Sequence, residues 1–164
     1  MTNFLKQIFS FILPVTVLVI VPLWIEKNQT INFGFPLFAG LILILFGLTM
    51  MAMTISSFIR IGKGTLAPWL PTKRLVIKGP YRYVRNPMIL GVMTVLLGEA
   101  LVLWSQNIFI WTAIFLLINT VYFILYEEPD LEKKFGNGYL RYKKHVSRWL
   151  PRLTPYLPEK QNEA

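Results

Sequence analysis

The chain has 164 residues, of which 54% are apolar, and it carries a formal net charge of +9. This apolar fraction exceeds that of an ordinary soluble domain, so a lipid bilayer is the first environment to consider. The chain has no cysteine and a single histidine, His145. This composition excludes disulfides, thiolate nucleophiles, and metal sites built from cysteine or from several histidines.

Long apolar stretches predict an all-α membrane protein with about four transmembrane helices. Uncharged runs of nineteen, thirty-two and twenty-seven residues separate three pairs of charged residues: Lys6 and Glu26, Lys27 and Arg60, Glu99 and Glu127. A spanning helix needs about twenty apolar residues, and one further stretch is interrupted only by Glu99. The predicted spans are Phe4–Ile25, Phe35–Ile59, Pro87–Trp104 and Ile108–Tyr126.

The first predicted span contains two prolines, Pro14 and Pro22. Each proline removes a backbone hydrogen bond, which neighbouring helices can replace inside a bundle, so the sequence predicts a kinked helix. A secretory signal is the alternative for this segment. The apolar run is too long for such a signal, and no small-residue cleavage site precedes Glu26, so we expect a membrane helix.

The distribution of lysine and arginine predicts the orientation in the membrane. Seven lie from Arg60 to Arg85, eight follow Tyr126, and the other loops contain only Lys27. With four spans, both basic segments lie on one side, and such residues favour the cytoplasmic side. We therefore expect a multi-pass plasma (inner) membrane protein with both termini in the cytoplasm. Anionic lipid accounts for the net charge, so no nucleic-acid partner is expected.

The loop between the second and third predicted spans contains residues that prevent a continuous helix: Pro68, Pro71, Gly79 and Pro80. Residues 75–77 predict a short extended piece. Asn86 followed by Pro87 fits a helix N-terminus, with Asn86 as the cap and Pro87 in the first turn. Free amides and the positive dipole end there, beside Arg85, suit a carboxylate or phosphate. Alternatively, Arg82 and Arg85 are only interfacial anchors.

Glu99 lies inside the third predicted span, where an ionisable side chain is costly and often functional. It is only about five residues from the outer end of that span, which favours snorkelling to the interface or a structural hydrogen bond. Glu99 is also a candidate proton acceptor.

Two consecutive acidic residues, Glu127 and Glu128, follow the fourth predicted span. Anions at a helix C-terminus oppose the helix dipole by a few tenths to about one kcal/mol each, so a cationic group is expected nearby. The partner is an arginine of the loop between the second and third predicted spans (the central loop), or Lys133 and Lys134, or a positively charged ligand.

The segment after the acidic pair begins with a predicted break at Phe135-Gly-Asn-Gly138. The residues that follow predict an amphipathic helix on the membrane surface that ends at Trp149-Leu-Pro151, with these side chains on one face: Tyr139, Tyr142, Val146 and Trp149. Residues 1–158 are expected to form one domain, and residues 159–164 a disordered tail.

Two motifs in this order resemble the isoprenylcysteine carboxyl methyltransferase and phospholipid methyltransferase superfamily of integral membrane enzymes. They are Gly79-Pro-Tyr-Arg-Tyr-Val-Arg-Asn-Pro-Met-Ile-Leu-Gly91, and Glu127-Glu-Pro-Asp-Leu131 with Phe135-Gly136, Tyr139 and Tyr142. The resemblance spans residues 64–152. It implies methyl transfer from S-adenosylmethionine to a lipid or lipid-modified acceptor within the bilayer, with no metal.

The same resemblance assigns the site position by position. It implies cofactor-binding walls and a helix start made of Lys73, Arg74, Leu75, Val76, Tyr81, Asn86, Pro87, Met88 and Ile89. Glu127 matches the family's cofactor-binding glutamate, and a carboxylate suits the amino group and ribose hydroxyls of the cofactor. Arg85 and Glu128 are the expected catalytic residues, Arg85 as a fixed charge beside the helix start and Glu128 as a proton acceptor.

Three positions depart from the family pattern. Asn86 replaces the usual histidine and cannot act as a general base near neutral pH. Met88 replaces a tyrosine that many members have. Phe123 stands where the isoprenylcysteine enzymes have a substrate-binding arginine, so a prenylcysteine carboxylate loses its partner. A phospholipid amine or another amphiphile is therefore favoured as the acceptor.

Other functions compete with methyl transfer. A non-catalytic homologue that keeps the fold as a structural or lipid-binding protein ranks second, because Asn86 and Met88 alter the site. A nicotinamide-dependent reductase related to the sterol reductases is disfavoured, because those chains are much longer. A channel or transporter is disfavoured because the spans contain few polar residues beyond Glu99, Asn119 and Thr120.

Overall fold

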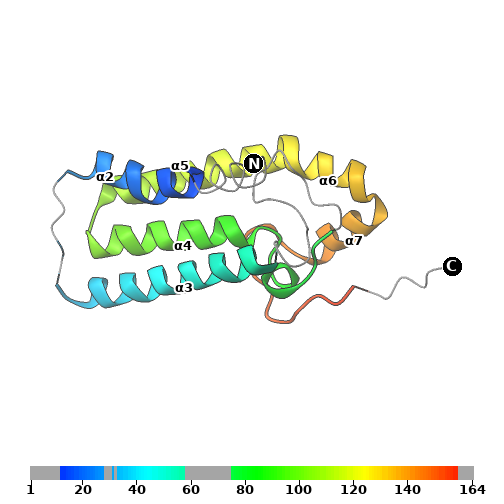
Figure 1. The fold of residues 1–164 in the computed structure, drawn as a ribbon, viewed down its shortest axis with the longest axis horizontal. Coiled ribbons are helices and arrows are strands. Elements are labelled where there is room, and N and C mark those ends of the chain that lie inside the picture. Colours follow the sequence, from blue (N-terminus) through cyan, green and yellow to red (C-terminus); the bar gives the residue numbers. More distant parts are fainter. Residues whose placement is uncertain (1–11, 28–30, 32, 58–74, 159–164) are drawn as a thin grey trace, which may run out of the picture.

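The computed structural model of the chain describes residues 12–27, 31, 33–57 and 75–158. The described residues are helical or irregular and contain no strand, which confirms the predicted all-α class. Figure 1 shows α4 lying between α3 and α5, with α2 beside α5. These helices are α2 (Val21–Ile25), α3 (Phe35–Ser57), α4 (Pro87–Val102) and α5 (Gln106–Tyr122).

The first described helix contains a π-helical turn, η1 (Thr16–Ile20), which leads into α2. The N–H of Val21 donates to the carbonyl of Thr16 in this wider pattern. The next hydrogen bond of this pattern would join the Pro22 N–H to the carbonyl of Val17, five residues earlier. Proline has no N–H, so the Val17 carbonyl is left without this bond. The indole Nε1 of Trp111 on α5 donates to the Val17 carbonyl instead, at 3.2 Å. A neighbouring helix thus satisfies the freed group, as the sequence predicts; the expected start at Phe4 lies outside the described residues.

Helices α3 and α4 pack with their backbones in contact, and glycines make this possible. Gly40 and Gly47 on α3 are buried and seven residues apart, and so are Gly91 and Gly98 on α4. A Cβ at Gly47 would lie 2.7 Å from the carbonyl oxygen of Gly91, and one at Gly40 would lie 2.6 Å from that of Gly98. Small residues at such contacts let two membrane helices approach closely and gain van der Waals packing.

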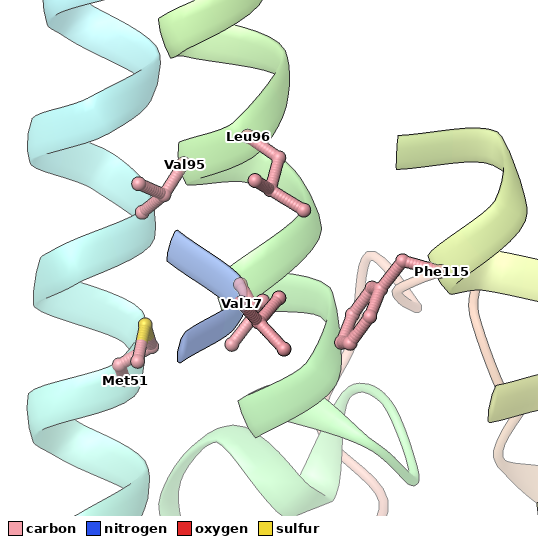
Figure 2. Packing of buried hydrophobic residues seen from close by; sticks show 6 residues of the cluster. Val17, Met51, Val95, Leu96 and Phe115 are labelled. Atoms are coloured by element: carbon pink, nitrogen blue, oxygen red, sulfur yellow. The ribbon is translucent and has the colours of Figure 1, made fainter. Parts of the chain in front are cut away.

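A cluster of buried apolar side chains joins the helices. Figure 2 shows Val17 of η1, Met51 of α3, Val95 and Leu96 of α4, and Phe115 of α5 packed together. Helix α4 is buried along much of its length, whereas α3 and α5 present large exposed apolar side chains on their other faces. An apolar outer surface of this kind suits a lipid environment.

Two described helices are long and apolar enough to cross a membrane: α3, and the continuous helix Gln106–Phe135. The second comprises α5, a π-helical turn η4 (Phe123–Glu127), and α6 (Glu128–Phe135). Thirty residues extend for about 45 Å, more than the roughly 30 Å hydrocarbon thickness. Because charged residues begin at Glu127, α6 projects beyond the apolar part. Shorter apolar helices are Ile12–Ile25 and Pro87–Val102.

The last helix, α7 (Asn137–His145), begins after Gly136, whose φ of 51° makes the predicted chain break. It ends at His145 because Val146 is extended, so the prediction of one helix reaching Trp149 is wrong. Tyr139 and Tyr142 are each 3% exposed and pack with Val146 against a cluster that includes Leu75 and Ile77. The apolar face that the sequence assigned to the membrane surface is therefore buried within the protein.

Gly47→Ala is expected to lower the free energy of unfolding by about 1–3 kcal/mol, because the added Cβ has no room against α4. Thermal unfolding of the purified protein in detergent measures this loss. Gly138→Ala is the matched control, since a Cβ there meets nothing within 4 Å. It should leave the midpoint unchanged or raise it slightly. Equal midpoints for the two variants would contradict the close helix contact.

Candidate functional site

The two sequence motifs meet at one end of the bundle, where α7 folds back beside the start of α4 (Figure 1). The turn η3 (Gly79–Arg82) begins at Gly79, whose φ of 57° favours glycine, and leads toward α4. Backbone hydrogen bonds of 2.9 Å attach this segment to the C-terminal part of the chain, joining Arg85 N–H to Ser147, Arg152 N–H to Tyr83, and Tyr156 N–H to Arg82. These bonds hold the first motif against residues 147–156.

Glu128 lies at the centre of this end. Its side chain is 4% exposed, and its Oε1 atom accepts hydrogen bonds from Arg85 Nη1 at 2.8 Å and from Arg148 Nε at 2.7 Å. Its Oε2 atom pairs with Lys143 Nζ at 2.9 Å. The central loop therefore supplies one of the predicted kinds of partner, Arg85, while Lys143 and Arg148 were missed by sequence reasoning because they reach Glu128 only when the chain reverses at Gly136.

These cations decide the protonation state of Glu128. Burial raises the pKa of its carboxyl, but the hydrogen bonds from Arg148 and Lys143 and the charges of Arg85 and Arg148 outweigh burial and hold that pKa below its ordinary value. The carboxylate of Glu128 is thus ionised, and both of its oxygens are paired with cations. It is a poor proton acceptor in this arrangement.

The neighbouring Glu127 is only partly buried and has a different environment. Within the described part of the chain, no hydrogen bond or ion pair reaches its carboxylate. Burial, the adjacent Tyr142 and the charge of Glu127 together raise the pKa of the Tyr81 phenol, so Glu127 and Tyr81 interact electrostatically. Tyr142 donates its hydroxyl hydrogen to the carbonyl of Tyr81 at 2.7 Å, which fixes this turn against α7.

Three buried donor atoms at this end have no hydrogen-bond partner among the described residues: Arg82 Nε, Arg85 Nε and Trp149 Nε1. The Arg85 side chain is only 9% exposed, and its Nη1 atom contacts both Glu128 and the Tyr139 hydroxyl. Trp149 packs edge-on against Phe123, with 5.8 Å between ring centroids. Buried donors without partners are rare in proteins, so this end is a candidate site for a ligand that carries oxygen acceptors.

The predicted helix start is in place. Asn86 occupies the N-cap position, as predicted, but its side chain makes no cap hydrogen bond. Pro87 is buried at the first helical position, and Met88 and Ile89 follow in the first turn, partly buried. The side chain of Asn86 is thus not committed to the backbone of α4.

The remaining predicted cofactor residues lie in the segment before η3. Val76 is buried, and Leu75 packs against the Tyr139–Tyr142 cluster. Lys73 and Arg74 lie outside the described residues. Within the described part, the fold thus brings Tyr81 near Glu127 and Arg85 onto Glu128, from motifs more than forty residues apart.

The sequence is similar to a known protein family over the part of the chain that forms this site. The sequence model of the family described as Phospholipid methyltransferase matches residues 35–138, more than half of the chain and a range that holds both acidic residues and the start of α4. A protein of Haemophilus influenzae (strain ATCC 51907 / DSM 11121 / KW20 / Rd), described as an uncharacterized protein, is 43% identical over 65 residues, which are 38% of this chain and the whole of that relative. No solved structure matches the chain.

Glu128→Gln is expected to destabilise the protein by about 3–5 kcal/mol, because it leaves a buried arginine without its counter-charge. Glu132→Gln is the matched control. Glu132 is 34% exposed and, among the described residues, pairs with Lys143 alone, at 2.6 Å, so its loss should cost less than about 1 kcal/mol. Denaturant unfolding in detergent measures both. A loss at Glu128 no larger than at Glu132 would show that the three cations do not depend on this carboxylate.

Acid should remove the same stabilisation. Since the folded-state pKa of Glu128 is lowered, its contribution is complete above the ordinary value of 4.5 and is lost as the pH falls below 4.5 toward the folded-state pKa. The stability difference between the unmodified protein and Glu128→Gln should therefore shrink below pH 4.5. A difference that stays constant from pH 7 to pH 3 would contradict this assignment.

Proposed function

The chain belongs to the phospholipid methyltransferase family, and from this premise we propose that it transfers a methyl group from S-adenosylmethionine to a lipid-like acceptor in the membrane. One observation carries the proposal. Where the two motifs meet, Glu127 is a carboxylate without a partner in the described part of the chain, next to Tyr81 and at the same end as the unpaired donors of Arg82 and Arg85.

The groups present there match the chemistry of the cofactor. An ammonium and ribose hydroxyls are donors for Glu127, and a carboxylate is an acceptor for the Nε atoms of Arg82 and Arg85. The proposed site also includes the other positions that the resemblance implies: Lys73, Arg74, Leu75, Val76, Asn86, Pro87, Met88 and Ile89. When bound, S-adenosylmethionine supplies an electrophilic methyl group that a nucleophile attacks in line, with no covalent enzyme intermediate.

In this proposal, Arg85 touches the ligand and Glu128 is a positioning residue. Three cations surround Glu128, so it holds Arg85 in place and does not accept a proton from the substrate. This revises the proton-accepting role that the sequence alone favours for Glu128. The protein's main contribution is then to orient cofactor and acceptor in a cleft that contains little water.

The acceptor is proposed to be a phospholipid amine, with an isoprenoid or thiol carboxylate as the less favoured class. Phe123 is buried against Trp149 and brings no positive charge to the position where a carboxylate substrate would need one. An amine places no such demand on this position.

The proposed arrangement in the membrane has four spans in a plasma (inner) membrane, with both termini and the Glu128 end in the cytoplasm. The apolar stretches Ile12–Ile25 and Pro87–Val102 would join the two longer helices as spans. The cations around Glu128 then lie on the side that basic residues favour. A cofactor from the cytosol would reach Glu127 directly, and a lipid would enter sideways from the bilayer.

The alternative function is a non-catalytic membrane homologue that uses the fold for a structural or lipid-binding role. Asn86 and the unpaired polar groups of the site are compatible with either function. Cofactor binding distinguishes the two, because only the enzyme requires it.

Isothermal titration of S-adenosylmethionine and S-adenosylhomocysteine into the detergent-purified protein tests the proposal. Glu127→Gln should weaken binding at least about tenfold, which corresponds to about 1.4 kcal/mol for one lost charge-assisted contact. Asp130→Asn, an exposed acid on the same helix, is the control and should bind normally. No binding by the folded, unmodified protein would favour the non-catalytic alternative.

Methyl transfer itself is tested with S-adenosylmethionine labelled on its methyl group. We expect label in phosphatidylethanolamine, and little in a prenylated cysteine, because Phe123 provides no charge for a carboxylate. Preferential labelling of the prenylated cysteine would contradict the amine assignment and leave the cofactor assignment intact.

A further inference from the structure

A cavity lies at the end of the bundle opposite to Glu128. It has a volume of about 230 Å³ and lies between the first helix and the end of α4. The residues that line it are Leu18, Val19, Pro22, Leu23, Glu99 and Leu103. Among the described residues of this lining, Glu99 is charged and the others are apolar.

Helix geometry separates this cavity from the proposed methyl-transfer site. Glu99 follows Pro87 by twelve residues on α4, and this places it about 18 Å along the helix from its start. Arg85 and Glu128 lie at that start. Glu99 is thus too far away to accept a proton from a substrate held there, a role that the sequence alone left open.

The Oε2 atom of Glu99 lacks a partner among the described residues. This atom is buried, and the structural hydrogen bond that the sequence favours is missing for it. The other carboxylate at this end, Glu26, is occupied: the Ser105 hydroxyl donates to it, and Ser105 also accepts from the Ile108 N–H at 3.2 Å. A buried carboxylate oxygen without a donor is energetically costly in an apolar environment.

We propose that this cavity binds the primary ammonium head of an amphiphile, held by Glu99. An ammonium offers three N–H donors and a positive charge, and Glu99 Oε2 has no donor among the described residues. The leucine and valine side chains that surround Glu99 suit the aliphatic part of the same molecule. The ligand class is therefore an amine-bearing lipid such as phosphatidylethanolamine, bound at a site separate from the one that holds the cofactor.

Native mass spectrometry of the full-length protein in detergent tests this site with two defined probes. Phosphatidylethanolamine carries a primary ammonium, whereas phosphatidylcholine with the same acyl chains carries a quaternary ammonium without N–H donors. The unmodified protein should retain phosphatidylethanolamine about tenfold more tightly, and Glu99→Leu should lower that preference to what the proposed acceptor site alone contributes. Asp130→Leu removes an exposed acid elsewhere and should leave the preference unchanged.

The outcomes separate this site from the proposed function. Glu99→Leu should bind S-adenosylmethionine as the unmodified protein does, which also shows that it is folded. An unchanged preference in Glu99→Leu, or no preference in the unmodified protein, would overturn the proposal whether or not the protein is a methyltransferase. Displacement of the lipid by an equal concentration of free ethanolamine would overturn the assignment to an amphiphile.

Discussion

The buried carboxylate of Glu128 connects parts of the chain that are distant in sequence. Arg85 precedes α4, Lys143 lies on α7, and Arg148 lies in the segment after it. Removing a carboxylate from water costs several kcal/mol unless charged donors replace the water, and three cations do so here. The requirement explains why α6 extends beyond the apolar part of its helix and why the chain then reverses at Gly136.

The glycine contact between α3 and α4 complements this ionic centre. Inside a bilayer, apolar side chains gain little from leaving lipid for protein, so close packing has to hold helices together. The pairs Gly40–Gly98 and Gly47–Gly91 allow only one register between the two helices, because a one-residue shift would set a side chain against a backbone. Helix α4 itself places its start at one end of the bundle and Glu99 near the other, and the contact with α3 holds α4 in the bundle.

Sequence reasoning predicts the elements that depend on local properties. Apolar length and proline position correctly place the starts of α3 at Phe35 and α4 at Pro87. The sequence also predicts a cationic group near the acidic pair, and of the three kinds that it leaves open, a central-loop arginine, Arg85, contacts Glu128. Sequence reasoning does not predict whether lipid or protein covers the apolar face of a helix. Periodicity groups Tyr139 with Tyr142, but lipid and protein are equally good partners for that face until the fold brings residues 75–77 against it.

Helix length fails for a related reason. The sequence ends the fourth span at Tyr126 because charges follow, yet charged side chains do not prevent backbone hydrogen bonds, and the helix continues to Phe135. Only the membrane-embedded part of a helix has to be apolar, so composition locates the border of the bilayer better than the end of the helix. The segment that carries Glu128 to its partners is this extension.

The π-helical turn Phe123–Glu127 determines which of two adjacent, identical acids faces the cations. A π-helical turn takes up one more residue than an α-helical turn, so every residue after it stands where its predecessor would stand in a regular helix. Glu128 therefore occupies the position facing the cations that Glu127 would otherwise take. The main chain thus decides which acid holds the fold together and which is left for a ligand, a distinction that side-chain chemistry alone cannot make.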